Sequence, residues 1–406
     1  MTLIQPFRAL RPVPSRAREV LAPPYDVLSS AEARERAKGR PWSFLHVSKA
    51  EIDLPPNTDP YSEAVYRKAA ENLQRMVAER VLTRDAQPHY YAYRTTWQGR
   101  RQTGLACVAS IAAYENGRIR KHELTTPAKE TDRVRQIEAL NAQTGPVMMA
   151  YPHAPEIDRA LKRATDRDPD VTVTADGDVT HDLWVIGDKA PMDELTQAFE
   201  ALPAIYIADG HHRSAAAARV AAARGTQEGP HRYFLSVIFP HHAMAILDYN
   251  RLIRDLNGRT PERLLEEIGQ RFTLTSSPEP ARPSAANEAG MYVDGRWYLL
   301  RLKGDLPQGA ALERLPITLL SRNLIEPLLG ISDPRTDKRI DFVGGGRGLG
   351  ELQRRVDSGE MKVAFALYPT QMEDLMAVAD AGAIMPPKST WFEPKLADGM
   401  VSHVLD

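Results

Sequence analysis

The most constraining feature of this chain is residues 204–224, where an apolar run passes through an Asp-Gly pair into a segment rich in alanine and arginine. Residues 204–208 (AIYIA) follow a proline and combine β-branched and aromatic side chains, which predicts a buried strand. Asp209 and Gly210 predict a turn, and residues 214–224 have the composition of a helix. The sequence therefore places a strand-to-helix junction at the Asp-Gly pair.

Two histidines and an arginine occupy this junction: His211, His212 and Arg213. The first-turn N–H groups of a helix lack intrahelical partners, and the helix dipole favours an anion there. Arg213 can add a bidentate contact to a phosphate, and the histidines can donate or carry protons near neutral pH. The pattern predicts a phosphate-binding corner that also includes Gly210 and Ser214. The alternative is an ordinary Asp-Gly turn that carries exposed polar side chains.

Composition excludes several classes of protein. With 406 residues and 43% hydrophobic content, the chain can bury a large core in one to three domains. A formal net charge of −1 gives it no electrostatic footprint for nucleic acid or an anionic membrane. No stretch approaches the roughly 18 apolar residues of a membrane span, and the N-terminus lacks the apolar centre of a signal peptide. We therefore expect a cytoplasmic protein without nucleic-acid or membrane partners.

The single cysteine, Cys107, lies in an apolar run. It excludes an internal disulfide and a multi-cysteine metal site, and its surroundings predict a buried, inert thiol. A zinc site is not predicted either. His211 and His212 are adjacent and so point in different directions, and no H-x-x-x-H or H-x-H pair occurs.

The hydrophobic pattern predicts an α+β fold with two lobes and the site between them. Helices are expected over residues 30–38, 61–82, 125–140, 157–164, 190–202, 261–271, 318–329, 350–356 and 371–381. Strands are expected over residues 44–47, 90–96, 103–114, 148–151, 232–239, 340–343 and 363–367, with hairpins over 171–185 and 291–302. We expect a phosphate-binding domain with insertions over residues 1–245 and a C-terminal α+β domain over residues 246–406.

A second polar group, His122-Glu123, follows a predicted strand and precedes a charged helix that carries Asp132 and Arg133. A histidine beside a carboxylate can act as a base or hold a magnesium-bound phosphate. The alternative is a solvated helix start, in which Glu123 interacts favourably with the helix dipole and Asp132 and Arg133 form an ion pair on the surface.

Lys388-Ser389-Thr390 resembles the end of a P-loop, but Pro387 occupies the second glycine position of that template. Because proline has no N–H to offer a phosphate, the P-loop interpretation fails. A cation-and-hydroxyl contact to an anion, with Lys395 nearby in the chain, and a plain surface loop both stay open.

The glycine run at residues 344–350 lies between a predicted strand and a predicted helix. It does not have dinucleotide-binding G-x-G-x-x-G spacing, since Leu349 stands in the sixth place counted from Gly344. We expect a flexible turn here, with backbone contact to a nucleotide phosphate as the alternative.

The Asp-Gly-His-His-Arg segment at residues 209–213 resembles the signature of the ParB/sulfiredoxin-like superfamily. The chain as a whole is similar, nearly end to end, to the bacterial and archaeal family known as domain of unknown function 1015. The motifs that carry this wider resemblance are residues 7–12 (FRALRP), residues 22–27 (APPYDV), His122-Glu123, Asp132-Arg133 and residues 386–390 (PPKST). Assigned members of this family look like ATP-dependent free-serine kinases.

The resemblance implies a ParB/sulfiredoxin-like core with a mixed sheet and helices, followed by a second α+β lobe. It implies phosphorylation of free L-serine to O-phospho-L-serine with ATP (or ADP) and Mg²⁺, and it is compatible with a homodimer. The implied catalytic residues are Asp26 or Glu123 as the base, with Asp209 and His211; the phosphate-binding residues are Gly210, His212, Arg213 and Ser214; the substrate-binding residues are His122, Arg133, Lys388, Ser389, Thr390 and Lys395. The alternatives are a nucleotide-dependent ParB-like regulatory protein without kinase activity and a phosphohydrolase.

Overall fold

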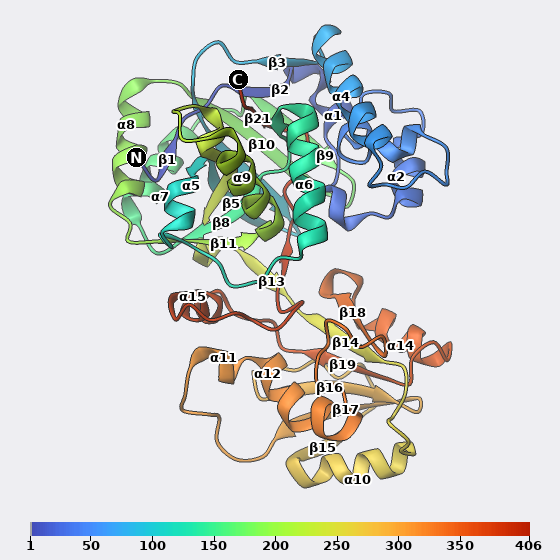
Figure 1. Ribbon diagram of the computed structural model, residues 1–406. Helices are drawn as coiled ribbons and strands as arrows, with labels where there is room; N and C mark the ends of the chain where they lie inside the picture. Colours follow the sequence, from blue (N-terminus) through green and yellow to red (C-terminus); the bar gives the residue numbers. More distant parts are fainter. Residues whose placement is uncertain (1) are drawn as a thin grey trace. The chain divides into compact units, whose positions relative to one another are not determined.

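The computed structural model describes residues 2–406, which form two compact units (Figure 1). The first unit runs to Met244 and also includes Pro394–Asp406, and the second unit is Ala245–Glu393. Both units combine helices with sheets, so the expected α+β class is confirmed. Among the described residues, no helix has both the length and the apolar character that crossing a bilayer requires.

The first unit is built on a nine-stranded sheet in the order β6-β11-β8-β12-β5-β4-β10-β9, with β1 paired to β5. The sheet is mixed because β11 runs parallel to β6 and β12 runs parallel to β8, whereas its other pairs are antiparallel. Its strands are β1 (Ile4–Gln5), β4 (Tyr90–Trp97), β5 (Arg100–Ser110), β6 (Ile119–Arg120), β8 (Val147–Tyr151), β9 (Val171–Ala175), β10 (Val179–Ile186), β11 (Ile205–Asp209) and β12 (Tyr233–Pro240).

Helix α9 packs against this sheet through small side chains. Ala217 and Ala221 of α9 belong to the same buried cluster as Ile205 and Ile207 of β11. The helices of the unit are α1 (Ala17–Val20), α2 (Ser30–Ala37), α3 (Leu45–Ser48), α4 (Glu63–Ala78), α5 (Ile111–Glu115), α6 (Pro127–Leu140), α7 (Pro155–Ala164), α8 (Lys189–Glu200) and α9 (His211–Arg224). Cys107 of β5 is fully buried, as predicted, and burial raises the pKa of its thiol.

A small four-stranded sheet ties the C-terminal segment to the first unit. Its order is β3 (Leu82–Arg84), β2 (Ala9–Pro12), β21 (Ser402–Val404) and β7 (Ala142–Gln143). Because β21 pairs with β2 and β7, the chain after Pro394 groups with the first unit. The domain predicted over residues 246–406 differs from this grouping, because sequence patterns do not reveal long-range strand pairing.

The second unit contains a six-stranded antiparallel sheet in the order β15-β17-β16-β19-β14-β18. The strands are β14 (Tyr249–Ile253), β15 (Phe272–Ser277), β16 (Glu288–Val293), β17 (Arg296–Leu302), β18 (Ile340–Gly344) and β19 (Val363–Leu367), and a separate pair joins β13 (Ala245–Leu247) to β20 (Trp391–Glu393). The helices are α10 (Pro261–Arg271), α11 (Ala311–Arg314), α12 (Pro316–Leu320), α13 (Glu326–Leu329), α14 (Leu349–Asp357) and α15 (Met372–Asp380).

Two local predictions were wrong for identifiable reasons, and a third, the helix over residues 318–329, is confirmed with an irregular turn. Residues 44–47 are predicted as a strand but lie at the start of helix α3, where Phe44, Leu45 and Val47 join a buried cluster that includes residues of α4. A short apolar run does not distinguish a strand from a helix. The strand over residues 103–114 ends at Ser110, whose hydroxyl caps α5. The helix over 318–329 contains a π turn just before Pro327, where the missing N–H interrupts regular α-helical bonding.

Candidate functional site

Two neighbouring parallel strands bring the two polar motifs together. Strands β6 and β11 pair in register, with Ile119 opposite Ile205 and Arg120 opposite Tyr206. His122-Glu123 follows the end of β6, and the Asp209-Gly210 turn closes β11. Because parallel strands end at the same edge of a sheet, the topology places these motifs side by side.

Gly210 makes the turn between β11 and α9 possible. Its φ of 101° lies in the left-handed region, and a Cβ there would stand 3.0 Å from Nε of Arg213. The backbone carbonyl of Gly210 accepts hydrogen bonds from the N–H groups of Arg213 and Ser214. The helix therefore starts directly after the turn, and glycine lets the guanidinium fold back over it.

Asp209, Arg213 and Lys395 form a partly buried charge cluster, which we call the charged corner. Nη2 of Arg213 donates to Oδ2 of Asp209 at 3.0 Å, and Nζ of Lys395 lies 3.7 Å from the same oxygen. Arg213 also donates to the carbonyl of Pro146. Burial raises the pKa of Asp209, but the attraction of Lys395 and Arg213 for its charged form lowers the pKa by more, so it lies below its usual range. The corner thus holds two cations around one ionised carboxylate.

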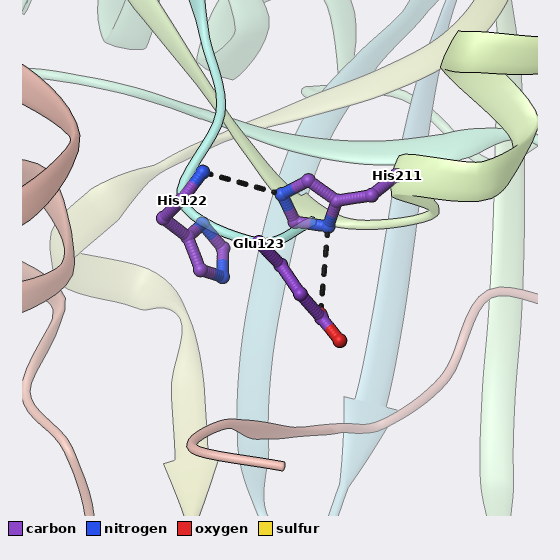
Figure 2. Close-up of side chains that lie close together, drawn as sticks. All are labelled: His122, Glu123 and His211. Atoms are coloured by element: carbon purple, nitrogen blue, oxygen red, sulfur yellow. Dashed lines mark hydrogen bonds and ion pairs between the residues drawn. The ribbon is translucent and has the colours of Figure 1, made fainter. Parts of the chain in front are cut away.

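His211 is a buried, neutral imidazole beside a carboxylate (Figure 2). Its Nε2 accepts from the backbone N–H of His122 at 3.5 Å, and its Nδ1 lies 3.8 Å from Oε2 of Glu123. Burial lowers the pKa of His211 well below its usual value, and the neighbouring His122 lowers it further. A neutral ring whose Nε2 accepts a hydrogen bond carries its proton on Nδ1, on the side of Glu123.

His122 packs edge to face on His211, with ring centroids 4.5 Å apart and planes at 89°. It is 1% exposed, and burial lowers its pKa to about 4. The Glu123 side chain is 38% exposed, so this side of the group of three residues reaches the surface of the unit.

The other two residues predicted at the start of α9 have structural contacts. Nε2 of His212 accepts from the backbone N–H of Thr126, the residue that precedes helix α6, at 3.1 Å. Ser214 is fully buried, and its hydroxyl donates to the carbonyl of His211 at 3.0 Å. These contacts join the two helices and seat the first turn of α9.

Asp398 is a carboxyl group that the sequence reasoning missed. It is 2% exposed, and its backbone pairs with Ala22 just before Tyr25. Burial raises the pKa of Asp398 to about 7; Arg213 opposes the shift and Asp26 adds to it. The signal in the sequence was an aspartate inside the otherwise apolar segment 396–401.

Asp398 and Arg213 line a small cavity of about 30 Å³, together with Tyr25 and Arg133 among others. That volume suffices for about one or two water molecules. The guanidinium of Arg133 stacks over the Tyr25 ring at 3.9 Å and donates to Oδ2 of Asp132 at 2.6 and 2.9 Å.

Asp26 lies in the short 3₁₀ turn Tyr25–Val27 that borders this cavity, and its side chain is exposed. Its charge raises the pKa values of both Arg213 and Asp398, although burial opposes the shift at the arginine. Asp26, Arg133, Asp398 and the charged corner therefore form one electrostatic group within the first unit.

Lys388, Ser389 and Thr390 belong to the second unit. Lys388 has a φ of 59°, and its Nζ lies 5.7 Å from the centre of the Tyr249 ring. The Ser389 hydroxyl donates to the carbonyl of Pro386 at 2.6 Å, and the Ser389 carbonyl accepts from the Thr370 hydroxyl at 2.9 Å. These contacts fix the loop after its two prolines.

Two groups of side chains in the described part of the chain have the composition and spacing of a metal site. His122, Glu123 and His211 can each direct one ligand atom so that all three lie within 4.8 Å of one another. His153, Asp158 and His242 meet the same distance criterion, but both histidines there are exposed. The charged corner offers a metal only the carboxylate of Asp209, which its two cations already engage.

Comparison with known proteins yields one family match. The model of a family described as "Protein of unknown function (DUF1015)" matches residues 4–321. No curated protein matches the chain.

Several solved structures are similar at low identity. A conserved hypothetical protein from Pyrococcus furiosus is 13% identical, with a TM-score of 0.37, and the alignment covers 73% of this chain and 94% of that protein. A free serine kinase in complex with AMP is 13% identical, with a TM-score of 0.36 and coverage of 71% and 86%. SbnI with a C-terminal truncation, from Staphylococcus aureus, is 12% identical, with a TM-score of 0.37 and coverage of 73% and 86%.

Proposed function

We propose that the charged corner binds nucleotide phosphates and that the protein is a small-molecule kinase. The chain belongs to the DUF1015 family of proteins of unknown function, whose model matches residues 4–321. The reaction we propose transfers the γ-phosphoryl group of ATP to a hydroxyl group, with free L-serine as the first acceptor to test. The motif resemblance of residues 209–213 to free-serine kinases supports the acceptor, and the geometry of the corner supports the phosphate site.

The observation that carries the proposal is the pair of cations at the start of α9. Arg213 uses one N–H on Pro146 and another on Asp209, and a guanidinium has five N–H donors, so further donors are available for a phosphate. Lys395 adds a second positive charge within 3.7 Å of Asp209. Both cations are partly buried, at 11% and 17% exposure, so their attraction for an anion is screened less than on an open surface.

Asp209 positions these cations. Its ionised carboxylate holds Nη2 of Arg213 and attracts Lys395, so neither long side chain has to be ordered by the nucleotide itself. Phosphoryl transfer depends mainly on positioning and on charge neutralisation, and a preorganised pair of cations supplies both.

The base that accepts the serine proton is a carboxylate, and two are suitably exposed. Asp26 is exposed beside Arg213 and Asp398, whereas Glu123 lies 3.8 Å from Nδ1 of His211. In the proposed step the serine oxygen forms a bond to the γ-phosphorus, the bond to the bridging oxygen breaks, and ADP leaves. The hydroxyl proton passes to the carboxylate. Mg²⁺ bound with ATP supplies charge neutralisation, and the oxygens of Asp26 and Glu123 are the type of ligand it prefers.

The test is product analysis with labelled ATP, Mg²⁺ and L-serine. We expect labelled O-phosphoserine from the wild type and little from Asp209→Asn and Arg213→Ala. Arg347→Ala, which changes an exposed arginine of the second unit, serves as the matched control and should retain activity. Nucleotide binding without a labelled acceptor would favour a regulatory switch, and release of inorganic phosphate alone would favour a phosphohydrolase. Absence of nucleotide binding would overturn the proposal.

A further inference from the structure

We propose that His122, Glu123 and His211 form a binding site for a divalent transition-metal ion of the zinc class. We call this group the His-Glu-His triad. The inference goes beyond the proposed kinase activity and does not rest on it; a metal ion bound by Glu123 would leave Asp26 as the base of the proposed reaction. The ion would be resident in the protein, unlike Mg²⁺ that arrives with a nucleotide.

The triad has the donor spacing of a site that closes on a metal by small side-chain movements. Its three ligand atoms lie within 4.8 Å of one another. Bonds of roughly 2.0–2.2 Å in tetrahedral geometry separate ligands by about 3.4 Å, so each side chain has to move by about 1 Å or less. Figure 2 shows the Glu123 side chain extending past both rings toward the Nδ1 side of His211.

His122 supplies an independent sign of a ligand. Its Nδ1 is buried and has no hydrogen-bond partner among residues 2–406. A buried nitrogen without a partner is costly, and a bound ion would satisfy it.

Binding of an ion at Nδ1 of His211 requires the proton on that nitrogen to leave, because Nε2 of the same ring accepts the backbone N–H of His122. Glu123 contributes the one negative charge, and its 38% exposure leaves a side of the triad open. Three protein ligands with an open position are the arrangement of catalytic rather than structural zinc sites.

The donor set selects the class of ion. Imidazole nitrogens favour Zn²⁺, Co²⁺, Fe²⁺ and related ions, whereas Mg²⁺ and Ca²⁺ prefer oxygen ligands only. The adjacent histidines of the sequence argued against zinc because His211 and His212 cannot share an ion. The structure instead pairs His211 with His122, which follows the neighbouring strand β6.

The chain contains an internal control. His153, Asp158 and His242 satisfy the same distance criterion, but their histidines are exposed and Asp158 already accepts a hydrogen bond from Tyr151 at 2.6 Å. If the buried triad is the site, changing His153 should leave metal binding intact.

The experiment uses the full chain, stripped with a chelator and titrated with Co²⁺ and then Zn²⁺ in competition with a chromophoric chelator. We expect one equivalent of Co²⁺ with visible d–d absorption that Zn²⁺ displaces, and affinity at least about 100-fold weaker in His211→Gln and Glu123→Gln. His153→Gln should match the wild type. Glu123→Gln alters a half-exposed side chain and keeps the variant set informative if His211→Gln does not fold.

Three results would overturn the proposal: no stoichiometric Co²⁺ binding, binding that survives Glu123→Gln and His211→Gln, or binding that disappears in His153→Gln. The readout needs neither ATP nor serine, so a failed metal titration leaves the kinase proposal standing, and a failed kinase assay leaves the metal site standing.

Discussion

Two glycine-containing strand-to-helix junctions of this chain, β11–α9 and β18–α14, differ in what their glycines accommodate. At the β11–α9 junction, Gly210 adopts a positive φ and makes room for the guanidinium of Arg213. At the β18–α14 junction, a Cβ on Gly344 would stand 2.5 Å from the Trp391 ring, and one on Gly345 would stand 2.4 Å from Oδ1 of Asp248. The glycine of the first junction therefore makes room for a charged side chain, and the glycines of the second make room for the side chains of Trp391 and Asp248.

The comparison shows why glycine before a helix is weak evidence for an anion site. Both junctions have a glycine at the start of a helix, and the second has more of them. What distinguishes the first is its pair of partly buried cations, Arg213 and Lys395, beside Asp209, whereas Arg282 beside the buried Asp248 of the second is 66% exposed. Arg347, the arginine in the glycine run of the second junction, is exposed.

The largest expected effect is that of Arg213→Ala on nucleotide binding and phosphoryl transfer. Removing the guanidinium takes away the main phosphate donor and leaves Asp209 with Lys395 alone, so we expect a loss of about 100- to 1,000-fold in turnover. Steady-state kinetics and nucleotide titration measure it. Arg213→Lys restores the positive charge but not the planar set of N–H donors of the guanidinium, so it should recover only part of the lost activity. Wild-type turnover in Arg213→Ala would remove the distinction between the junctions.

The next effect concerns stability at the second junction. Gly345→Ala would place its Cβ 2.4 Å from Oδ1 of Asp248 and 2.9 Å from the Asp248 carbonyl oxygen, which itself accepts the Gly345 N–H at 2.7 Å. We expect a loss of about 2 kcal/mol in the free energy of unfolding, because neighbouring backbone cannot yield easily.

Gly346→Ala is the matched control for this substitution, since the nearest atom to its Cβ would be 3.7 Å away. Urea unfolding of both variants and the wild type gives the comparison. Equal stability of the two variants would show that packing does not explain the glycines of the second junction.

A third effect uses pH to separate the junctions, because Asp398 lies beside the first. Its folded pKa of about 7 exceeds the unfolded value of roughly 3.9, so between these values the folded state binds more protons. The stability of the wild type should therefore fall as pH rises through this window. Relative to Asp398→Asn, we expect it to decrease by about 1 kcal/mol per pH unit from pH 5 to pH 7.

The comparison with Asp398→Asn is needed because buried histidines act in the opposite direction. Burial lowers the pKa values of His122, His181 and His403 to about 4, so their contribution to stability rises with pH up to roughly pH 6.5. Taking the difference between the two proteins cancels this contribution. A difference that stays constant from pH 5 to pH 8 would contradict the role assigned to Asp398.

Local sequence patterns were sufficient to predict the junction itself. The apolar run before Asp209, the glycine, and the alanine-rich segment after it gave β11, the turn and α9. The helix starts at His211, earlier than expected, because the Gly210 carbonyl already accepts the N–H groups of Arg213 and Ser214. Short-range rules suffice here because strand, turn and helix are all set within a few residues.

The partners of the junction could not be predicted in the same way. Asp398 reaches the first unit through long-range pairing of β21 with β2, and His122 meets His211 through the parallel pairing of β6 with β11. Such pairings depend on tertiary structure, which the local periodicity of hydrophobic residues does not encode. The same limit explains the error at residues 44–47, where tertiary packing decided between helix and strand.

The smallest expected effect is that of Arg347→Ala, and it is the direct test of the comparison. The Arg347 side chain is exposed in the glycine run of the second junction, so its removal should change the free energy of unfolding by less than about 0.5 kcal/mol. Nucleotide affinity should stay within about twofold of the wild type, because solvent and salt screen the attraction between an exposed charge and an anion. Urea unfolding and nucleotide titration check both values. A tenfold loss of nucleotide affinity in Arg347→Ala, with stability unchanged, would mean that the second junction also binds phosphate. The inference that only the β11–α9 junction, and not the β18–α14 junction, binds an anion would then be wrong.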